Sequence, residues 1–480
     1  TLFPYTTLFR STGTTLRPSI VVNEIKKMFP KVLINDYVVN KMSLNSLINT
    51  EESSYVHLLS AMRENKDNSL EDSNWLSVYE WYKKNNAELS DLILNGLSYK
   101  NKAGKLSESS SANLYGNRMN SSISQMETFA NCPFRFYLTY GLNVKERKIF
   151  KLANPDIGTF LHDILDKFAK YIEANNLLWR ELTKEDINDI SSKIIDETLS
   201  EVRYGIFSSN NKLKFLSIKL KRVVKRILWI ITLQIKTSQF DVFSSEFEFG
   251  DNSNHPGIEV ELSDGKKLSL RGKIDRVDIA KTEDGKYIRI IDYKTYDNKL
   301  KISNVYYGLQ LQLITYLSAV SNDELIPGGA LYLRLDDPII KTKKDISVEE
   351  IEEEIRKHLK MDGIILADAK LVKAMDTDME NESSNLNLKV KKDGSYSSMP
   401  TVNEEEFKQL MKHTKTILKQ FSEEIYNGNV EINPVKHKDG TGCDFCKYKE
   451  ICNFDKELGN RFKKIDELKN EEVFEQIKMF

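Results

Sequence analysis

The distribution of the cysteines constrains the fold of this 480-residue chain more than any other feature of its sequence. Cys132 stands alone, whereas Cys443, Cys446 and Cys452 follow one another more than 300 residues later. These three can bind one metal centre, and Cys132 brings the number of thiolates to the four that a zinc site or a [4Fe–4S] cluster requires. Ordinary buried thiols would be scattered through apolar helices, but these lie beside Pro, Gly and charged residues. The sequence therefore predicts a metal–thiolate site that joins two distant segments, and the spacing leaves zinc and iron–sulfur open.

The overall composition is that of a globular protein of about two to four domains, because 40% of the residues are hydrophobic and 29% are charged. The formal net charge of −1 excludes a histone-like polycation, so any contact with nucleic acid must come from a local basic surface. The most apolar stretch, Ile227–Ile231, is far short of the ~20 residues of a membrane span. The N-terminal residues lack a secretory signal pattern. We therefore expect a cytoplasmic protein with no membrane contact.

Changes in residue pattern divide the chain into five segments. The first fifteen residues begin with Thr and have no recognisable period, so we expect them to be non-native and the rest to be a piece of a longer protein. A polar helical segment follows, and then a stretch rich in Ser, Asn and Gly that predicts a linker. The predicted segments are 1–15 (non-native or unplaced), 16–100 (helical), 101–120 (linker), 121–455 (one α/β domain) and 456–480 (C-terminal helical tail).

The α/β domain combines amphipathic helices with one block of strands. Asp-Gly pairs at 264–265 and 284–285 mark hairpin turns in the strand block, which spans residues 241–296. Residues 376–398 are polar and predict a flexible excursion. The sequence has no Gly-rich phosphate loop, because Ala103–Leu106 lacks an upstream Gly and a following Ser or Thr. The spacing of apolar residues predicts helices over 124–130, 158–173, 184–201, 212–236, 305–320, 348–361 and 404–426.

Two acidic residues and a lysine lie on neighbouring strands of this block. Alternation along Tyr287–Tyr296 puts Asp292 and Lys294 on one face, ~6.6–7 Å apart. The turn at 284–285 returns the chain beside the strand that holds Asp275, so the two carboxylates can meet. Carboxylate oxygens bind Mg²⁺, and a lysine can orient a water or neutralise a phosphate. An exposed ion pair is the common alternative, but the flanking isoleucines indicate a buried strand, where a charge needs a partner or a metal.

Side chains on two predicted helices can complete such a site. His162 borders the apolar stripe of its helix, so its imidazole can reach inward as a nitrogen ligand; the commoner alternative is a structural or exposed histidine. On the later helix, Gln312 and Tyr316 are four residues apart and share a face, whereas Gln310 lies on a different one. An amide and a phenol there can orient a water or a phosphate. The alternative is a helix whose polar residues face solvent.

A strongly basic helix is predicted over residues 212–236, which carry eight Lys or Arg and no acidic residue. Its apolar residues form one stripe, as in an ordinary amphipathic helix with a solvated face. Lys219, Arg222 and Arg226 are the candidates for contact with DNA phosphates, and such contacts would make binding sensitive to salt.

Several short motifs together resemble a known nuclease family. They are GTFLHDIL from Gly158, RGKIDRVD from Arg271, IIDYKTY from Ile290 and GLQLQLITYL from Gly308. These are similar to the motifs of RecB-type PD-(D/E)xK nucleases. The split cysteines, in ANCPFRFYLTYGL and GCDFCKYKEIC, narrow the resemblance to the AddB family, subunits of bacterial AddAB ATP-dependent helicase–nucleases. The resemblance runs from about residue 121 to 455, and more weakly back to about residue 17.

The resemblance implies a fold and a set of site residues. The fold would be a PD-(D/E)xK, restriction-endonuclease-like α/β core, with a mixed sheet flanked by helices and a four-cysteine iron–sulfur staple. Residues 16–100 would be the tail of an inactive helicase-like domain. The cysteines would hold a [4Fe–4S] cluster that ties the nuclease domain together. The implied site residues are His162, Asp275 and Asp292 (Mg²⁺), Lys294 (catalytic), Glu246 (a less secure acidic position), either Gln310 or Gln312 (the family's glutamine), and Tyr316.

The resemblance also implies an activity and a partner. The chain would be a metal-dependent DNA exonuclease domain that cuts the 5′-ended strand during resection of double-strand breaks for recombinational repair. An AddA-like helicase–nuclease subunit would supply the motor, and this chain would have no ATPase activity of its own. The alternative is an iron–sulfur or zinc protein that holds DNA as a scaffold without cutting it. The Asp–Asp–Lys set favours the nuclease.

Overall fold

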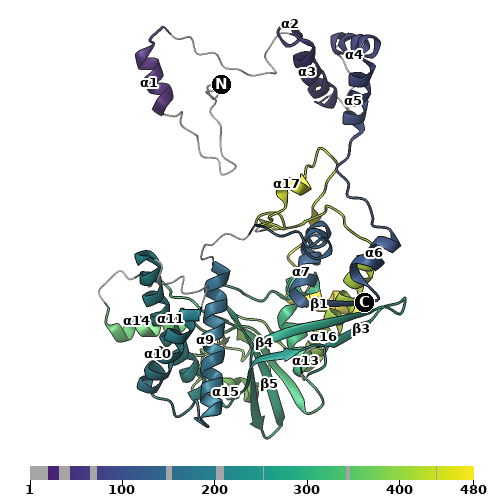
Figure 1. Ribbon diagram of the computed structural model, residues 1–480. Coiled ribbons are helices and arrows are strands. Elements are labelled where there is room, and N and C mark those ends of the chain that lie inside the picture. Colours follow the sequence, from purple (N-terminus) through teal and green to yellow (C-terminus); the bar gives the residue numbers. More distant parts are fainter. Residues whose placement is uncertain are drawn as a thin grey trace. The chain divides into compact units, whose positions relative to one another are not determined.

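The computed structural model describes residues 20–31, 44–64, 73–147, 154–201, 210–251, 253, 255–341, 346–438 and 440–479. The chain divides into two compact units, residues 1–100 and 101–480, which we describe one at a time (Figure 1). The segment 1–15, for which we expect a non-native origin, lies outside the described residues.

The described part of the first unit is helical. Its helices are α1 (Ile20–Met28), α2 (Leu44–Leu47), α3 (Glu51–Glu64), α4 (Ser73–Asn85) and α5 (Ala87–Ser98). A small core forms around Leu58, Tyr82 and Ile93, whereas Trp81 is half-exposed. The side chain of Asn86 accepts a hydrogen bond from the backbone N–H of Leu89, and this cap explains why α5 begins directly after α4.

The second unit is built on a mixed sheet. Its strands are β1 (Arg118–Ser122), β2 (Asp241–Phe249), β3 (Ile258–Glu261), β4 (Lys267–Thr282), β5 (Gly285–Lys294), β6 (Leu325–Arg334), β7 (Asp362–Leu366) and β10 (Thr401–Val402). The order is β1-β4-β5-β6-β7-β10, and β2 and β3 also pair with β4. β5 and β6 run parallel, whereas β4/β5 and β6/β7 are antiparallel. Burial along β5 is nearly continuous, which is typical of a strand covered on both faces.

Helices cover both faces of this sheet, with α9, α10 and α11 on one side and α7, α13 and α16 on the other (Figure 1). The helices of the unit are α6 (Glu108–Tyr115), α7 (Ile123–Asn131), α8 (Pro133–Phe136), α9 (Asn154–Ala174), α10 (Lys184–Glu201), α11 (Asn211–Lys236), α12 (Ile302–Tyr306), α13 (Gln312–Val320), α14 (Val348–His358), α15 (Ala369–Met375), α16 (Glu404–Tyr426), α17 (Lys449–Cys452) and α18 (Asn470–Met479). One continuous apolar core joins both helix layers to the sheet. The predicted α/β architecture, a mixed sheet flanked by helices, is confirmed.

Two small sheets lie outside the main one. β11 (Val435–His437) pairs with β12 (Gly440–Thr441) and β13 (Lys463–Lys464) on either side of the late cysteines. β8 (Lys389–Val390) and β9 (Tyr396–Ser397) form a short antiparallel pair.

The prediction of one continuous helix over residues 305–320 is wrong. α12 ends at Tyr306 and α13 begins at Gln312. Between them Gly308 has φ +78°, and a Cβ at this position would approach a ring carbon of Phe421 to 2.5 Å. Only glycine fits this turn. The apolar spacing continues across the break, so the helical period in the sequence does not reveal it.

The prediction of a flexible excursion over residues 376–398 is also wrong. Asp376, Ser383 and Asn385 are completely buried. Oδ2 of Asp376 accepts hydrogen bonds from Oγ of Ser383 at 2.6 Å and from the backbone N–H of Ser384 at 2.7 Å. Asp376, Ser383 and Asn385 thus bond to one another and to backbone groups inside the protein, whereas residues 391–395 of the same segment are exposed.

The segments expected to be a linker and a tail both contribute to the second unit. Residues 101–120 include α6 and most of β1, which pairs with β4. At the other end of the chain, Val473, Phe474 and Ile477 on α18 are buried in the main core. The linker and the tail are therefore parts of the folded unit that begins at Asn101.

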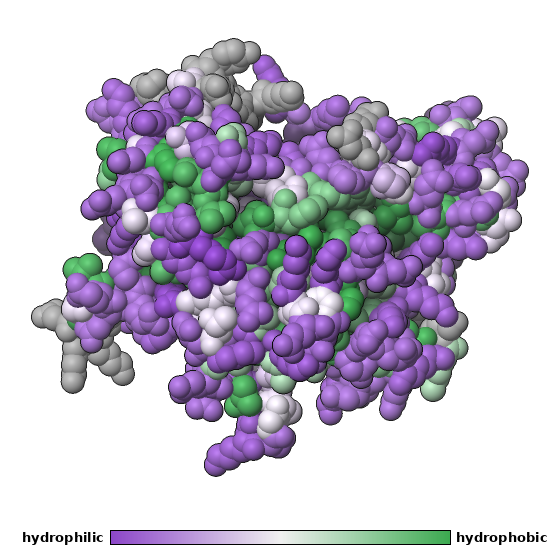
Figure 2. All heavy atoms as spheres, turned by 90° about the horizontal axis from the view of Figure 1, so that it is seen from below, coloured by the Kyte–Doolittle hydropathy of each residue, from purple (hydrophilic) through white to green (hydrophobic). Residues whose placement is uncertain are grey.

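The surface is mostly hydrophilic on the face seen from below in Figure 1, and hydrophobic side chains show in a recessed band across its middle (Figure 2). Among the helices that the structure describes, none is both long enough and apolar enough to cross a lipid bilayer.

Candidate active site

Asp275 and Asp292 meet where β4 and β5 begin to separate. Arg276 on β4 pairs with Ile291 on β5, and the next residues along the two strands are Asp275 and Asp292. Both are buried, with 9% and 3% of their surface exposed. Oδ2 of Asp275 accepts a hydrogen bond from the backbone N–H of Tyr293 at 2.6 Å. Burial and the charge of Asp275 raise the pKa of Asp292 to about 6, because two carboxylates resist ionising together in a buried place.

His162, Glu246 and Asp275 converge from three elements, α9, β2 and β4. One ligand atom from each lies within 4.8 Å of the other two. Nδ1 of His162 is 3.0 Å from Oδ1 of Asp275. Burial alone lowers the pKa of His162, but the hydrogen bond and the charge of Asp275 outweigh it, and the net shift is upward. An imidazole and two carboxylates form a donor set that binds divalent cations.

Glu246 reaches this group from an unusual backbone conformation. Its neighbours in β2 pair with the β4 residues that flank Asp275, so Glu246 stands opposite Asp275. Its φ is +49°, a region that costs a non-glycine residue ~1–3 kcal/mol and is concentrated at functional sites. Lys273 forms an ion pair with its carboxylate. The backbone conformation is a signal that the sequence, which suggested Glu246 only weakly, does not carry.

Lys294, Asp292 and Gln312 form a closed ring of polar contacts. Nζ of Lys294 makes an ion pair with Asp292 and donates a hydrogen bond to Oε1 of Gln312 at 3.1 Å. Nε2 of Gln312 donates to Oδ1 of Asp292 at 2.7 Å. Burial alone lowers the pKa of Lys294, but the carboxylate of Asp292 outweighs it and the net shift is upward. The lysine is therefore held protonated between a carboxylate and an amide.

The structure separates the two candidate glutamines. Gln310 lies in the turn between α12 and α13, where its Oε1 accepts from the backbone N–H of Lys301 at 3.0 Å and its Nε2 donates to the carbonyl of Lys299 at 3.0 Å. It is not in contact with the buried acids. Gln312 and Tyr316 lie one turn apart on α13, close enough for the Gln312 side chain to act on the pKa of Tyr316, which burial raises. Gln312 is thus the glutamine that touches Asp292.

Tyr316 packs tightly against β4. A Cβ on Gly272 would approach a ring carbon of Tyr316 to 2.7 Å and one of Phe249 to 2.5 Å. The glycine of the Arg-Gly-Lys sequence therefore lets the phenol reach the sheet beside the acidic group. Tyr316 is 8% exposed.

Glu127, on α7, is a residue that the sequence analysis missed. Its Oε1 accepts hydrogen bonds from the backbone N–H groups of Leu311 at 2.7 Å and Gln312 at 3.0 Å, the start of α13. A carboxylate at this end of a helix is stabilised by unpaired N–H groups. Burial raises the pKa of Glu127 to about 7, although these hydrogen bonds and Lys294 oppose the shift. The one sequence signal is an acid within the predicted helix 124–130, five residues before Cys132.

A second buried charge cluster lies on the same two strands. Asp278 accepts hydrogen bonds from Nε and Nη2 of Arg276 at 2.8 and 2.7 Å and from Nε of Arg289 at 3.0 Å. Asp278 and Arg289 are completely buried, and the guanidinium of Arg289 lies 4.4 Å from the ring centroid of Phe240. The sequence analysis did not anticipate this cluster, because the pairing of the strands is needed to bring Arg289 to Asp278.

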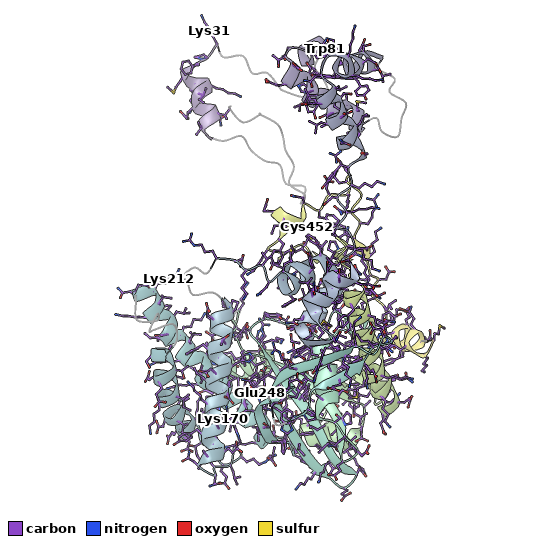
Figure 3. The ribbon with its side chains drawn as sticks, turned by 45° about the vertical axis from the view of Figure 1, so that its right-hand side comes forward. Lys31, Trp81, Lys170, Lys212, Glu248 and Cys452 are labelled. Carbon is purple, nitrogen blue, oxygen red and sulfur yellow. The ribbon has the colours of Figure 1, made fainter. Side chains whose placement is uncertain are left out.

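The cysteines come together from both ends of the unit. Cys132 is buried at the end of α7, and Cys443, Cys446 and Cys452 are half-buried around α17. Figure 3 marks Cys452 in the C-terminal segment close to α7. Burial raises the pKa of both Cys132 and Cys452 to about 11, and the neighbouring cysteines add to each shift. Four thiols are the number of donors that a zinc site or a [4Fe–4S] cluster takes, so the donor set fits such a centre by its chemistry.

The three basic candidates on α11 have different surroundings. Arg222 and Arg226 both pair with Asp337, and Nη1 of Arg226 lies 2.6 Å from Oδ1 of that residue. Lys219 is exposed. Arg226 is mostly buried, whereas Arg222, whose side chain is 62% exposed, and Lys219 present their charge to solvent.

Comparison with known proteins gives matches in both units. A family model for the PD-(D/E)XK nuclease superfamily matches residues 120–453. A model for the ATP-dependent helicase/deoxyribonuclease AddB fifth domain matches residues 44–96.

Longer relatives have names that agree with these models. The chain is 40% identical to an ATP-dependent helicase/deoxyribonuclease subunit from Clostridium novyi (strain NT), over 97% of this chain and 42% of that protein. It is 39% identical to the protein of the same name from Alkaliphilus oremlandii (strain OhILAs), with the same coverage. The chain thus spans about two-fifths of the length of these relatives. The expected resemblance to AddB subunits is confirmed, and because the superfamily model matches more than half of its residues, the chain belongs to the PD-(D/E)XK nuclease superfamily.

Proposed function

We propose that this chain is the nuclease-bearing part of an AddB-type subunit and acts as a metal-dependent DNA exonuclease. The observation that carries the proposal is the convergence of His162, Glu246 and Asp275 beside the ring of Asp292, Lys294 and Gln312. Two unlike groups of polar side chains, one suited to a cation and one holding a protonated lysine, meet at one place on β4 and β5. This is the arrangement that hydrolysis of a phosphodiester requires.

The metal site fits Mg²⁺ by its donor chemistry. Asp275, Asp292 and His162 are the proposed ligands, and Glu246 is a further carboxylate within reach of the same place. Mg²⁺ prefers carboxylate oxygens and keeps several waters, so an incomplete protein ligand set suits it. When bound, the ion acidifies a water and stabilises charge on a phosphate oxygen.

The side chains around the ligands have distinct roles in the proposal. Lys294 offers its ammonium group to the phosphate or the attacking water, and the contacts with Asp292 and Gln312 hold it in place. Tyr316 lies one helical turn from Gln312 and packs beside it against β4. Glu127 positions Gln312 by fixing the start of α13. We assign Gln310 to the structure of the 298–304 turn, not to the site.

The four cysteines are proposed to hold a [4Fe–4S] cluster that ties the two ends of the unit together. The support is the presence of four thiols and their mutual effect on one another's pKa. Quantifying iron, sulfide and zinc in anaerobically purified protein tests this directly. Cys132→Ser is expected to lose the visible absorbance and to lower the unfolding midpoint. An unchanged spectrum and midpoint, or stoichiometric zinc, would reject the cluster.

The cellular role follows from the relatives and is part of the proposal. With an AddA-like helicase–nuclease subunit as partner, the chain would degrade the 5′-ended strand at double-strand breaks before recombinational repair, in the cytoplasm. The resemblance to AddB subunits assigns the ATP-driven motor to the partner, and this chain has no Gly-rich phosphate loop of its own.

Lys294→Ala is the decisive variant for the nuclease activity. It removes the ammonium group that contacts Asp292 and Gln312, so we expect Mg²⁺-dependent digestion of single-stranded DNA to be abolished in the full-length protein with its partner. The unfolding midpoint should fall, because Asp292 stays buried without its paired cation, and circular dichroism at the assay temperature checks that the variant is folded. Lys281→Ala, an exposed lysine on the same hairpin, is the matched control. Normal digestion by Lys294→Ala would refute the assignment. DNA binding without cleavage by the unmodified protein would favour a non-catalytic scaffold.

A further inference from the structure

A charged pocket opens where β5 and β6 end and β7 begins. β5 and β6 are parallel, so their carboxyl ends share one edge of the sheet, and the antiparallel β7 starts there with Asp362 opposite Tyr332. The pocket has a volume of about 230 Å³, and Lys294 is part of its lining. It therefore adjoins the candidate active site. Ligands of open α/β sheets commonly bind at this edge, beyond the carboxyl ends of the strands.

The pocket is lined by more positive than negative side chains. Its cations are Lys294, Lys299, Arg334, Lys357 and Lys360, and its carboxylates are Asp297 and Asp362. This balance favours an anionic ligand. The volume is below the ~300–1,000 Å³ of pockets that enclose a whole small molecule, so one phosphate or one base fits better than a free cofactor.

The cations differ in how far they are already engaged. Lys360 pairs with Glu382 at 2.8 Å and Lys357 with Glu354 at 2.8 Å. Asp336 lies 2.7 Å from Nη2 of Arg334 and orients the guanidinium, which remains 27% exposed. Lys299 is exposed, and no carboxylate of the described residues forms an ion pair with it. Nη1 of Arg334 also pairs with Asp297 at 3.9 Å, so Lys299 is the side chain whose charge is most available to a phosphate.

An exposed aromatic ring lies at the mouth of the same pocket. Tyr296 follows Lys294 by two residues and is 59% exposed. Tyr332 forms the inner wall, with Nζ of Lys294 5.7 Å from its ring centroid. Aromatic rings beside cations are typical of proteins that bind single-stranded nucleic acid, because unpaired bases stack on the ring while the cations follow the backbone. A duplex offers no free base face to Tyr296.

We propose that this pocket binds one nucleotide of single-stranded DNA next to the phosphate that is cut. Lys299 contacts its phosphate, and Tyr296 stacks on its base. The position beside the cut phosphate rests on the proposed nuclease function. The binding of a single-stranded nucleotide does not, because it depends on the pocket alone.

Binding is measured in the absence of divalent metal, so the test does not require cleavage. The full-length protein is titrated with a short single-stranded oligonucleotide that carries 2-aminopurine, and with the matching duplex. The variants are Tyr296→Ala, Tyr296→Trp and Lys299→Ala. The controls are Tyr171→Ala, a 39% exposed tyrosine on α9, and Lys193→Ala, an exposed lysine on α10.

Tyr296→Ala is expected to weaken single-strand binding about five- to a hundredfold and to abolish the quenching of 2-aminopurine, whereas Tyr296→Trp retains both. Lys299→Ala is expected to reduce the slope of log affinity against log salt by about 0.7. Both controls should match the unmodified protein. Equal losses for single strand and duplex, or no difference between Tyr296→Ala and Tyr171→Ala, would overturn the proposal. If the unmodified protein does not cut DNA but these binding differences hold, the nuclease function fails and the subsite stands.

Discussion

Two charge clusters on β4 and β5 consist of similar residues but differ in how the charges of their acids are balanced. Asp278 lies between two guanidinium groups and is completely buried, so its charge is neutralised by residues close to it in the fold. Asp275 is three residues from Asp278 on β4, and Asp292 is three residues from Arg289 on β5, so both acids lie on the other face of the strands. There they are near each other, with Lys294 as the paired cation. The pKa of Asp292 is raised as a result.

The difference shows how a structural and a functional cluster can be told apart. In the Arg276–Asp278–Arg289 cluster the acid is paired with cations, as buried ions require. In the acidic cluster the carboxylates repel, an imidazole stands beside them, and Glu246 is held in a costly backbone conformation. Three carboxylates, those of Asp275, Asp292 and Glu246, share the two lysines Lys294 and Lys273, and this excess of acids indicates a place for a cation.

Asp275→Asn should give the largest effect and should separate activity from stability. Removing one carboxylate from the proposed metal site is expected to lower Mg²⁺-dependent cleavage by about 10³-fold or more. The unfolding midpoint should stay the same or rise, because the substitution relieves the repulsion that raises the pKa of Asp292. Cleavage rates and thermal unfolding of the same preparation check both expectations. A lower unfolding midpoint with unchanged cleavage would mean that Asp275 has a structural role and is not a metal ligand.

Asp278→Asn should lower stability, in contrast to Asp275→Asn, which should lower cleavage. It leaves two buried guanidinium groups without a counter-charge, so the free energy of unfolding is expected to fall by about 3–5 kcal/mol. Urea unfolding measures this, with Asp323→Asn, an exposed aspartate, as the control that should change by less than about 0.5 kcal/mol. A decrease in the free energy of unfolding of less than about 1 kcal/mol would show that the Arg276–Asp278–Arg289 cluster is not needed for stability.

Glu127 allows a pH test at the edge of the acidic cluster. Its pKa rises from an ordinary 4.5 to about 7 on folding, so the native state binds the proton more tightly. Stability should therefore fall as the pH rises from 4.5 to 7, by about 3 kcal/mol in total. Glu127→Gln keeps the hydrogen-bond acceptor and removes the charge. The stability of the variant relative to the unmodified protein should thus increase across that window, and parallel pH profiles would contradict the burial of an ionisable Glu127.

The smallest effects on DNA binding and stability are expected on α11, where Arg226 is mostly buried and Lys219 faces solvent. Lys219→Ala should reduce the salt dependence of DNA binding by less than one unit of slope and leave stability unchanged, because the side chain is exposed. Arg226→Ala should leave the slope unchanged and lower stability, because its guanidinium is 17% exposed and pairs with Asp337. Equal changes in slope for the two variants would mean that Arg226 contacts DNA in spite of its ion pairs with Asp337 and Glu352.

Much of the site was predictable because it lies on regular structure. Alternation along β5 predicted that Asp292 and Lys294 share a face, and the turn at 284–285 predicted that Asp275 approaches them. The apolar stripe of α9 predicted an inward His162. Each of these inferences depends on a short-range period that residue type controls directly.

Other features depended on contacts between segments far apart in the chain. The break at Gly308 is set by the ring of Phe421, more than 100 residues later, and it decides that Gln312, not Gln310, reaches Asp292. Glu127 acquires its role only when α7 packs beside the start of α13. The burial of Asp376, Ser383 and Asn385 could not be recognised, because Asn385 finds a partner far away in the chain, Oγ1 of Thr237, at 2.9 Å.

The sequence by itself determined the α/β class, the paired acids with their lysine, and the four cysteines that must meet, because these depend on local periods and on residue chemistry. The tertiary structure alone decided which charges are neutralised and which are left unbalanced. The physical reason is that a carboxylate's state depends on burial and on neighbours within a few ångströms. On the same two strands, packing gave Asp278 two cations and gave Asp292 another acid.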